Sequence, residues 1–142
     1  TMFLPAGKII TSTKGREEKL SETHVSGGGK YAEIPLVVLA NGYSASASEI
    51  LVAAIKENGR GKIVGETTFG KGSVQSVIPL SNGGSIHLTI AKFYSPNGNV
   101  IHGKGVSPDV EVKIENPNNF KMGDPKNDAQ LAKAMELLVG SK

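Results

Sequence analysis

The segment from Pro35 to Gly59 constrains the fold more than any other part of this sequence. Leu36–Ala40 is a short, continuous apolar run with β-branched residues, and it is closed by the turn-forming pair Asn41-Gly42. Such a run predicts a buried strand with both faces covered. Small and apolar side chains then recur at helical spacing over residues 46–57, which predicts a closely packed helix. The chain therefore passes from a buried strand through a tight turn into a helix.

Capping signals mark both ends of this helix. Ser46 and Glu49 form the S-x-x-E pattern of a capping box, and Asn58-Gly59 supplies a C-terminal stop. Ser46 is thus expected at or beside the N-cap, directly after a buried strand. By these rules alone Ser46 is more often a plain helix cap than a catalytic group.

The remaining pattern predicts several strands, a hairpin and a second helix. The expected elements are strands at Lys8–Thr13 and Lys62–Glu66, a hairpin of 73–80 and 85–95 joined by Ser81–Gly84, a helix at Ala129–Val139, a flexible loop over 14–33 and a polar linker over 115–127. With 18 glycines and 7 prolines in 142 residues, the chain is rich in turns. A strand–helix–strand unit followed by a hairpin predicts one domain of the mixed α/β class.

Composition argues against several classes of function. Aromatic residues make up 5% and Trp is absent, which leaves little for a surface that stacks on bases. The net charge of +3 comes from basic residues spread along the chain, without a polybasic run. The absence of Cys excludes disulfides and thiolate metal ligands, and no apolar run is long enough to span a bilayer. We expect no nucleic-acid partner, no integral membrane segment in this chain and no metal site.

The stretch GETTFGKGS, Gly65–Ser73, differs from a phosphate-binding loop at one position. Gly70 and Lys71 fit that loop, but Gly72 stands where a Ser or Thr hydroxyl must hold magnesium. The residues that follow alternate like a strand, whereas the phosphate-binding loop leads into a helix. Nucleotide binding is therefore disfavoured, and it would require a measurable affinity for Mg-ATP.

A lysine between two glycines also suits general-base chemistry. Lysine acts as a base only when desolvation or a nearby positive charge lowers its pKa from about 10.4 towards neutrality. Gly70 and Gly72 allow the backbone around Lys71 to turn tightly, and Phe69 and Val74 can supply an apolar wall.

The partner of such a lysine would be a serine that faces a helix N-terminus and free backbone N–H groups. Ser46 meets this description, and the N–H of Ala47 is then the natural oxyanion donor. The sequence therefore offers a serine–lysine pair as well as a helix cap.

Four motifs in order carry a family resemblance. NGYSASASEI, GETTFGKGSVQSVIPL, GGSIHLTIAKFYSPNG and HGKGVSPDVEV resemble the core of the C-terminal processing peptidases, also called tail-specific proteases. The likeness runs nearly continuously from Pro35 to Val112 and more weakly through Asp128–Leu138. It implies a partial crotonase-like fold, a β-β-α spiral, and a serine endopeptidase with a Ser-Lys dyad.

Carried over residue by residue, the resemblance makes Ser46 the nucleophile, Lys71 the general base and Gln75 the residue that orients the lysine. Positions 71 and 75 share parity, so their side chains would face the same side if the segment is extended. The implied substrates are polypeptides with accessible, unfolded C-terminal tails. No organic cofactor or metal is implied, and oligomerisation is left open. The implied location is extracytoplasmic, in the bacterial periplasm or cell envelope or in the thylakoid lumen.

Two features of the family have no counterpart in these residues. The family carries an upstream Asn-Pro-Gly-Gly turn, which supplies a second oxyanion donor, and a PDZ domain that engages substrate C-termini. We therefore expect residues 1–142 to be the C-terminal part of a catalytic domain, and to be inactive or nearly so in isolation, because one lost oxyanion donor costs about 10²–10³ in turnover.

The alternatives give the same residues ordinary roles. Ser44 and Ser48 are expected to be structural, and Glu49 and Asp109 to serve the helix cap and a turn. The three histidines, His24, His87 and His102, share no metal-ligand spacing and have no acid placed to orient them, so we expect surface positions. As a whole, the chain could instead be a non-catalytic scaffold or interaction module that keeps the peptidase fold.

Overall fold

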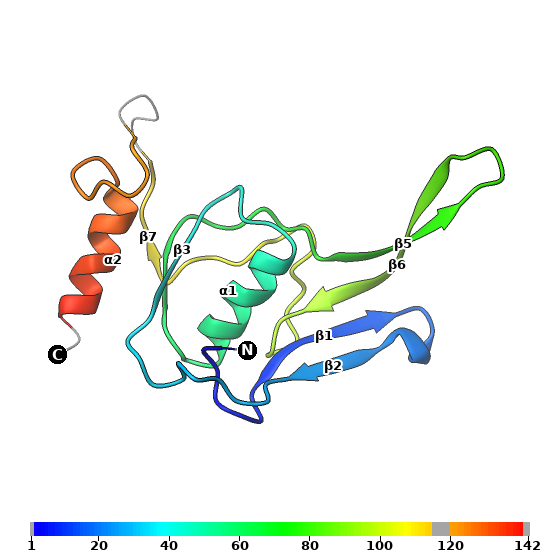
Figure 1. The fold of residues 1–142 in the computed structure, drawn as a ribbon, viewed down its shortest axis with the longest axis horizontal. Helices are drawn as coiled ribbons and strands as arrows, with labels where there is room; N and C mark the ends of the chain where they lie inside the picture. The colour runs from blue at the N-terminus through cyan, green and yellow to red at the C-terminus, as the bar shows by residue number, and fades with distance from the viewer. Residues whose placement is uncertain (1, 115–119, 141–142) are drawn as a thin grey trace.

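The computed structural model describes residues 2–114 and 120–140, and it has the predicted mixed α/β architecture (Figure 1). The linker predicted over 115–127 falls partly outside these ranges. In chain order the elements are β1 (Ile9–Gly15), the 3-10 helix η1 (Glu18–Leu20), β2 (Glu22–Val25), β3 (Val37–Ala40), α1 (Ala47–Glu57), β4 (Lys62–Gly65), β5 (Ser73–Pro79), β6 (Ser85–Tyr94), β7 (Val110–Glu111) and α2 (Ala129–Val139).

A parallel sheet and α1 form the core. The strand order is β3-β4-β7, and α1 connects β3 to β4 in a strand–helix–strand unit. Ile63 of β4 is fully buried and packs with Val52, Ala54 and Ile55 of α1 and with Leu4. The small residues of α1 allow its close approach to the sheet, as the sequence predicted.

The strand predicted at Leu36–Ala40 is confirmed as β3, but the expectation that both its faces are covered is wrong. β3 is an edge strand and Leu39 is 42% exposed. The fully covered strand is β4, in which Ile63, Val64 and Gly65 are all buried. An apolar run does not reveal strand order, because tertiary pairing decides which strand takes the centre.

The second sheet is antiparallel, with the order β2-β1-β6-β5. Its edge strand β2 corrects the prediction of a flexible loop over residues 14–33, since Glu22–Val25 pairs with β1 and Ser12 stands opposite Thr23. All four β2 side chains are exposed. The segment therefore lacks the alternation of apolar and polar residues that identifies a half-buried strand.

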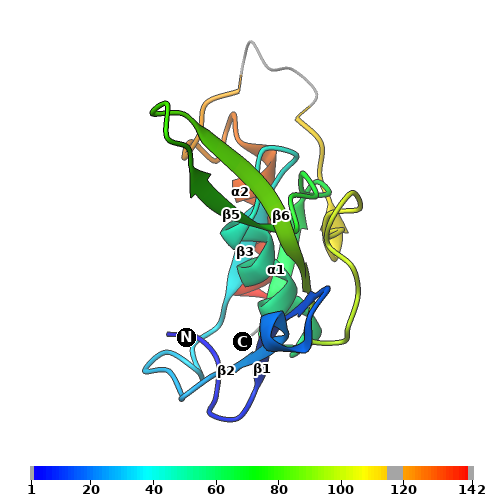
Figure 2. The ribbon, with the colours of Figure 1, turned by 90° about the vertical axis from the view of Figure 1, so that its right-hand side faces the viewer.

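The predicted hairpin is confirmed as β5 and β6, with Ile78 opposite Ile86. One extra residue of β6, Ile90, shifts the register between Val74 and Gln75. The hairpin projects away from the core, and Figures 1 and 2 place it and α2 on opposite sides of the parallel sheet and α1.

The second helix, α2, has the predicted bounds and packs against β3 and β4. The Asp128 side chain caps its N-terminus by accepting the N–H of Leu131 at 2.9 Å. On this helix Ala134 is buried and Leu131 half-buried, whereas Met135 and Leu138 are exposed. Over the described residues, neither helix has the length and apolar character needed to cross a membrane.

Candidate active site

Ser46 stands between β3 and α1 in a backbone conformation that side chains rarely adopt. Its φ is 58° and its ψ is −116°. Within 2–114 and 120–140 it is the one non-glycine residue with a positive φ. A conformation of this kind costs of order 1–3 kcal/mol and is typically kept at functional sites. The neighbours Ala45 and Ala47 are small, so little side-chain bulk adjoins the hydroxyl.

Ser46 and Glu49 form the predicted capping box. In it the Ser46 N–H donates to Glu49 Oε2 at 2.9 Å. The Glu49 N–H donates to the Ser46 carbonyl oxygen at 2.9 Å. The N–H of Ala47 has no acceptor in the described part of the chain. A helix N-terminus with an unused N–H favours negative charge nearby.

Glu49 does far more than cap the helix. Its side chain is fully buried and its two carboxylate oxygens accept four hydrogen bonds. Oε1 accepts from the Thr68 hydroxyl at 2.5 Å and the Gly70 N–H at 2.6 Å. Oε2 accepts from the N–H groups of Ser46 and Lys71, at 2.9 Å and 2.7 Å.

These bonds join the serine turn to the lysine loop. Because the N–H groups of Ser46 and Lys71 donate to the same oxygen atom, the two backbones lie side by side. A further bond from the Phe69 N–H to the Ser44 carbonyl oxygen, at 3.0 Å, strengthens the link. The four donors and the helix N-terminus together stabilise a carboxylate that burial would otherwise penalise.

Sequence reasoning missed this role of Glu49. The S-x-x-E pattern located the residue but explained it by a local contact three positions away. The bonds to Thr68, Gly70 and Lys71 span 19 to 22 residues along the chain. No spacing rule links positions so far apart, so only the assembled structure reveals the connection.

The glycines on either side of Lys71 are required by close approach, as predicted. Gly70 has a φ of +94°, and its carbonyl oxygen accepts the Gly103 N–H at 2.8 Å. A Cβ on Gly72 would lie 2.6 Å from the backbone nitrogen of His102. The loop around His102 and Gly103 therefore packs directly on the lysine loop.

The predicted apolar wall around Lys71 is absent from the described structure. Phe69 is 68% exposed, Val74 is half-buried, and the Lys71 side chain is itself exposed. After Gly72 the chain enters β5, which agrees with the expectation of a strand there rather than the helix of a phosphate-binding loop.

The structure brings the backbones of Ser46 and Lys71 together but does not join their side chains. Among the described residues, neither the Lys71 amine nor the Gln75 amide makes a hydrogen bond. Gln75 is exposed and lies within β5, which begins at Ser73, so Lys71 precedes the extended segment. The proposed roles of these three side chains therefore stay predictions.

The residues expected to be ordinary have structural partners. The Ser44 hydroxyl accepts the Asn41 N–H at 3.2 Å, which closes the turn after β3. Asp109 accepts the Ile63 N–H at 2.8 Å. His24 lies 3.6 Å from Glu22 on β2, and His87 stands opposite Val77 on the hairpin.

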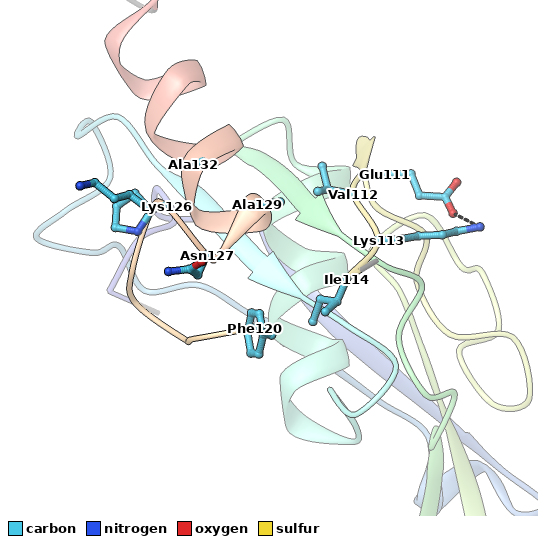
Figure 3. A pocket seen from close by; sticks show the side chains of 10 residues that line it. Glu111, Val112, Lys113, Ile114, Phe120, Lys126, Asn127, Ala129 and Ala132 are labelled. Atoms are coloured by element: carbon cyan, nitrogen blue, oxygen red, sulfur yellow. Dashed lines mark ion pairs between the residues drawn. The ribbon is translucent and has the colours of Figure 1, made fainter. Parts of the chain in front are cut away.

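One cavity lies away from the serine turn. It has a volume of about 710 Å³ and lies between residues 111–114, at and after the end of β7, and the start of α2. Figure 3 shows the side chains that line it, among them Ile114 and Phe120, and the ion pair between Glu111 and Lys113. None of its lining residues is a candidate catalytic residue. A smaller apolar cavity of about 300 Å³ is lined by Ala47 and other residues of α1, by Ile10 and by residues 2–4.

Comparisons with known proteins identify relatives of this chain. The model of "Peptidase family S41" matches residues 1–112. The chain is 36% identical to the carboxy-terminal-processing protease of Bartonella bacilliformis, over 97% of this chain and 39% of that protein. It is 37% identical to a carboxyl-terminal-processing protease of Synechocystis, over 98% of this chain and 32% of that one.

Among solved structures, a photosystem II D1 C-terminal processing protease superposes with a TM-score of 0.73 at 35% identity, covering 89% of this chain and 31% of that chain. The chain therefore belongs to peptidase family S41, and the predicted resemblance is confirmed. It spans well under half the length of these relatives.

Proposed function

We propose that this chain carries the catalytic serine and lysine of a serine endopeptidase that cleaves polypeptides near accessible C-terminal tails. The observation that carries the proposal is the geometry of Ser46. A strained serine precedes a helix N-terminus, and its backbone is bound through Glu49 to the backbone of Lys71.

In the proposed reaction, the Ser46 hydroxyl attacks the scissile carbonyl carbon and its proton passes to a neutral Lys71 amine. The carbonyl oxygen becomes an oxyanion, which the Ala47 N–H and the N-terminus of α1 stabilise. Lys71 then gives a proton to the leaving amine as the C–N bond breaks. Water, deprotonated by Lys71, hydrolyses the acyl-enzyme and restores the serine. Gln75 is assigned the orientation of the lysine.

A neutral lysine needs shielding from water, and the described residues leave Lys71 exposed. We propose that bound substrate, or protein outside these 142 residues, covers the amine. The second oxyanion donor and a PDZ domain would likewise come from outside them. By family resemblance we assign an extracytoplasmic location, in the bacterial periplasm or cell envelope, and a relative from Arabidopsis thaliana named as chloroplastic supports the alternative of the thylakoid lumen.

The test is hydrolysis of casein by the full-length protein and by Ser46→Ala and Lys71→Ala variants. Each substitution should lower turnover at least a thousandfold, because nucleophile and base act as one unit. Ser48→Ala is the matched control, since Ser48 is an exposed serine on the same helix turn, and it should keep normal turnover. Retained cleavage by Lys71→Ala would contradict the proposed mechanism.

A non-catalytic scaffold is the second candidate, and the exposed, unbonded Lys71 amine favours it. It predicts that the full-length protein does not hydrolyse casein while Ser46→Ala still binds polypeptides as the unmodified protein does.

A further inference from the structure

The outer edge of β5 has no strand beside it in the described structure. β5 is the last strand in the order β2-β1-β6-β5, and within residues 2–114 and 120–140 it pairs only with β6. An unpaired edge presents free N–H and C=O groups to any extended chain that reaches it. β5 begins at Ser73, directly after Lys71 and Gly72. Its first five residues, Ser73–Val77, lead away from the candidate site.

Two backbone hydrogen bonds establish which groups of β5 point outwards. At one end the Phe93 N–H donates to the Gly72 carbonyl oxygen at 2.7 Å, and at the other the Leu80 N–H donates to the Gly84 carbonyl oxygen at 2.8 Å. Backbone groups alternate in direction along an antiparallel strand. Both ends therefore give the same parity: even-numbered residues of β5 bond to β6, and Ser73, Gln75 and Val77 direct their N–H and C=O groups outwards.

Pro79 agrees with this parity. A proline has no N–H and is accepted in a strand where its nitrogen faces away from the ladder. Pro79 is odd-numbered, so its nitrogen lies on the free edge and the ladder with β6 is intact. It also ends the run of outward N–H groups, so the part of the edge able to pair fully is the part nearest Lys71.

We propose that the polypeptide substrate binds as an added antiparallel or parallel strand on the β5 edge, through the outward backbone groups of Ser73, Gln75 and Val77. This inference rests on the proposed function. We assign the edge to the substrate because the edge is continuous with the candidate site. It begins two residues after Lys71, and Gln75 belongs both to the edge and to the candidate site. Main-chain pairing also recognises an extended, unfolded chain without requiring a particular sequence.

The first test uses backbone amide exchange, measured by NMR on full-length Ser46→Ala protein with and without an uncleaved peptide substrate. Without peptide, the amides of Ser73, Gln75 and Val77 should exchange fast, whereas those of Val74 and Ser76 should be protected by β6. Peptide should slow the three odd-numbered amides at least tenfold. Odd-numbered amides already protected without peptide would mean that another part of the protein covers the edge, and would overturn the proposal.

The second test uses the active full-length protein and peptides N-methylated at one backbone nitrogen at a time. Methylation should raise KM about fivefold or more at every second peptide position, since each lost hydrogen bond weakens binding by a factor of that size. Methylation at the positions between them should leave KM unchanged. A KM that is the same along the whole series would overturn the added strand.

Val77→Pro provides a third measurement, because it removes one outward N–H and leaves the ladder with β6 in place. It should raise KM with little change in kcat, and Val77→Ala is the matched control with that N–H retained. If Val77→Pro instead separates an oligomer and leaves KM unchanged, the edge pairs with a second copy and the proposal is wrong. Failure of the proposed function is distinguishable, since then Lys71→Ala would retain cleavage.

Discussion

At the scale of single residues, the side chain of Glu49 is held in place by its burial and by its hydrogen-bond donors. It is fully buried, and its partners are N–H or O–H donors from two separate segments of the chain. Among the described residues it has no ion-pair partner, so the stability of its carboxylate depends on those donors. The residue thus links the conformation of Ser46 to the position of the lysine loop.

Glu49→Gln should lower the free energy of unfolding by about 2–4 kcal/mol, because an amide nitrogen would face buried donors and leave some of them unpaired. Denaturant unfolding of the full-length protein measures this. Glu57→Gln is the control. Like Glu49, Glu57 accepts hydrogen bonds on its carboxylate, two of them, from Asn97 and Asn99, but it is only half-buried. Equal stability of the two variants would contradict the role given to Glu49.

At the scale of elements, the candidate site depends on the close packing of two loops, the loop that carries Lys71 and the loop around His102. Gly72 lies against the backbone of His102, and Gly70 receives a hydrogen bond from Gly103. The loop that carries Lys71 is therefore held from one side by α1, through Glu49, and from the other by the loop before β7.

Gly72→Ala should separate these loops, since its Cβ would lie 2.6 Å from the His102 nitrogen. Overpacking of this kind costs about 1–3 kcal/mol, and the displaced Lys71 should also lower kcat. Gly27→Ala is the matched control, because a Cβ there meets nothing within 4 Å. Thermal unfolding and casein hydrolysis measure the two effects, and an unchanged Gly72→Ala protein would show that the contact is not needed.

At the scale of the whole molecule, the described structure contains the serine turn, the lysine loop and the Ala47 N–H, which is proposed as one oxyanion donor. In the proposed mechanism, the other donor and a PDZ domain would come from outside these 142 residues. The chain covers 39% and 32% of two of its relatives.

If the second oxyanion donor lies outside residues 1–142, as proposed, these residues alone should hydrolyse casein at least about 10²–10³ times more slowly than the full-length protein. Circular dichroism must first show that the isolated residues are folded. A folded 142-residue protein with the full-length rate would mean that these residues suffice for catalysis.

The prediction of fold from sequence succeeded where local patterns act. The bounds of α2 were predicted residue for residue, and α1 begins and ends at its capping signals, Ser46 and Asn58. The β5–β6 hairpin followed from the Ser81–Gly84 turn. The prediction failed for β2, whose side chains are all exposed, and for the degree of burial of β3. Neither the pairing of β2 nor the burial of β3 depends on local sequence.

The sequence by itself determined the helices, the hairpin, the family and the candidate residues Ser46, Lys71 and Gln75, because capping, turn and periodicity signals act over a few neighbouring positions. Only the tertiary structure decided the positive φ of Ser46, the burial of Glu49 and the free edge of β5. These features arise where segments distant in the chain meet, and hydrogen bonds between such segments leave no periodic trace in the sequence.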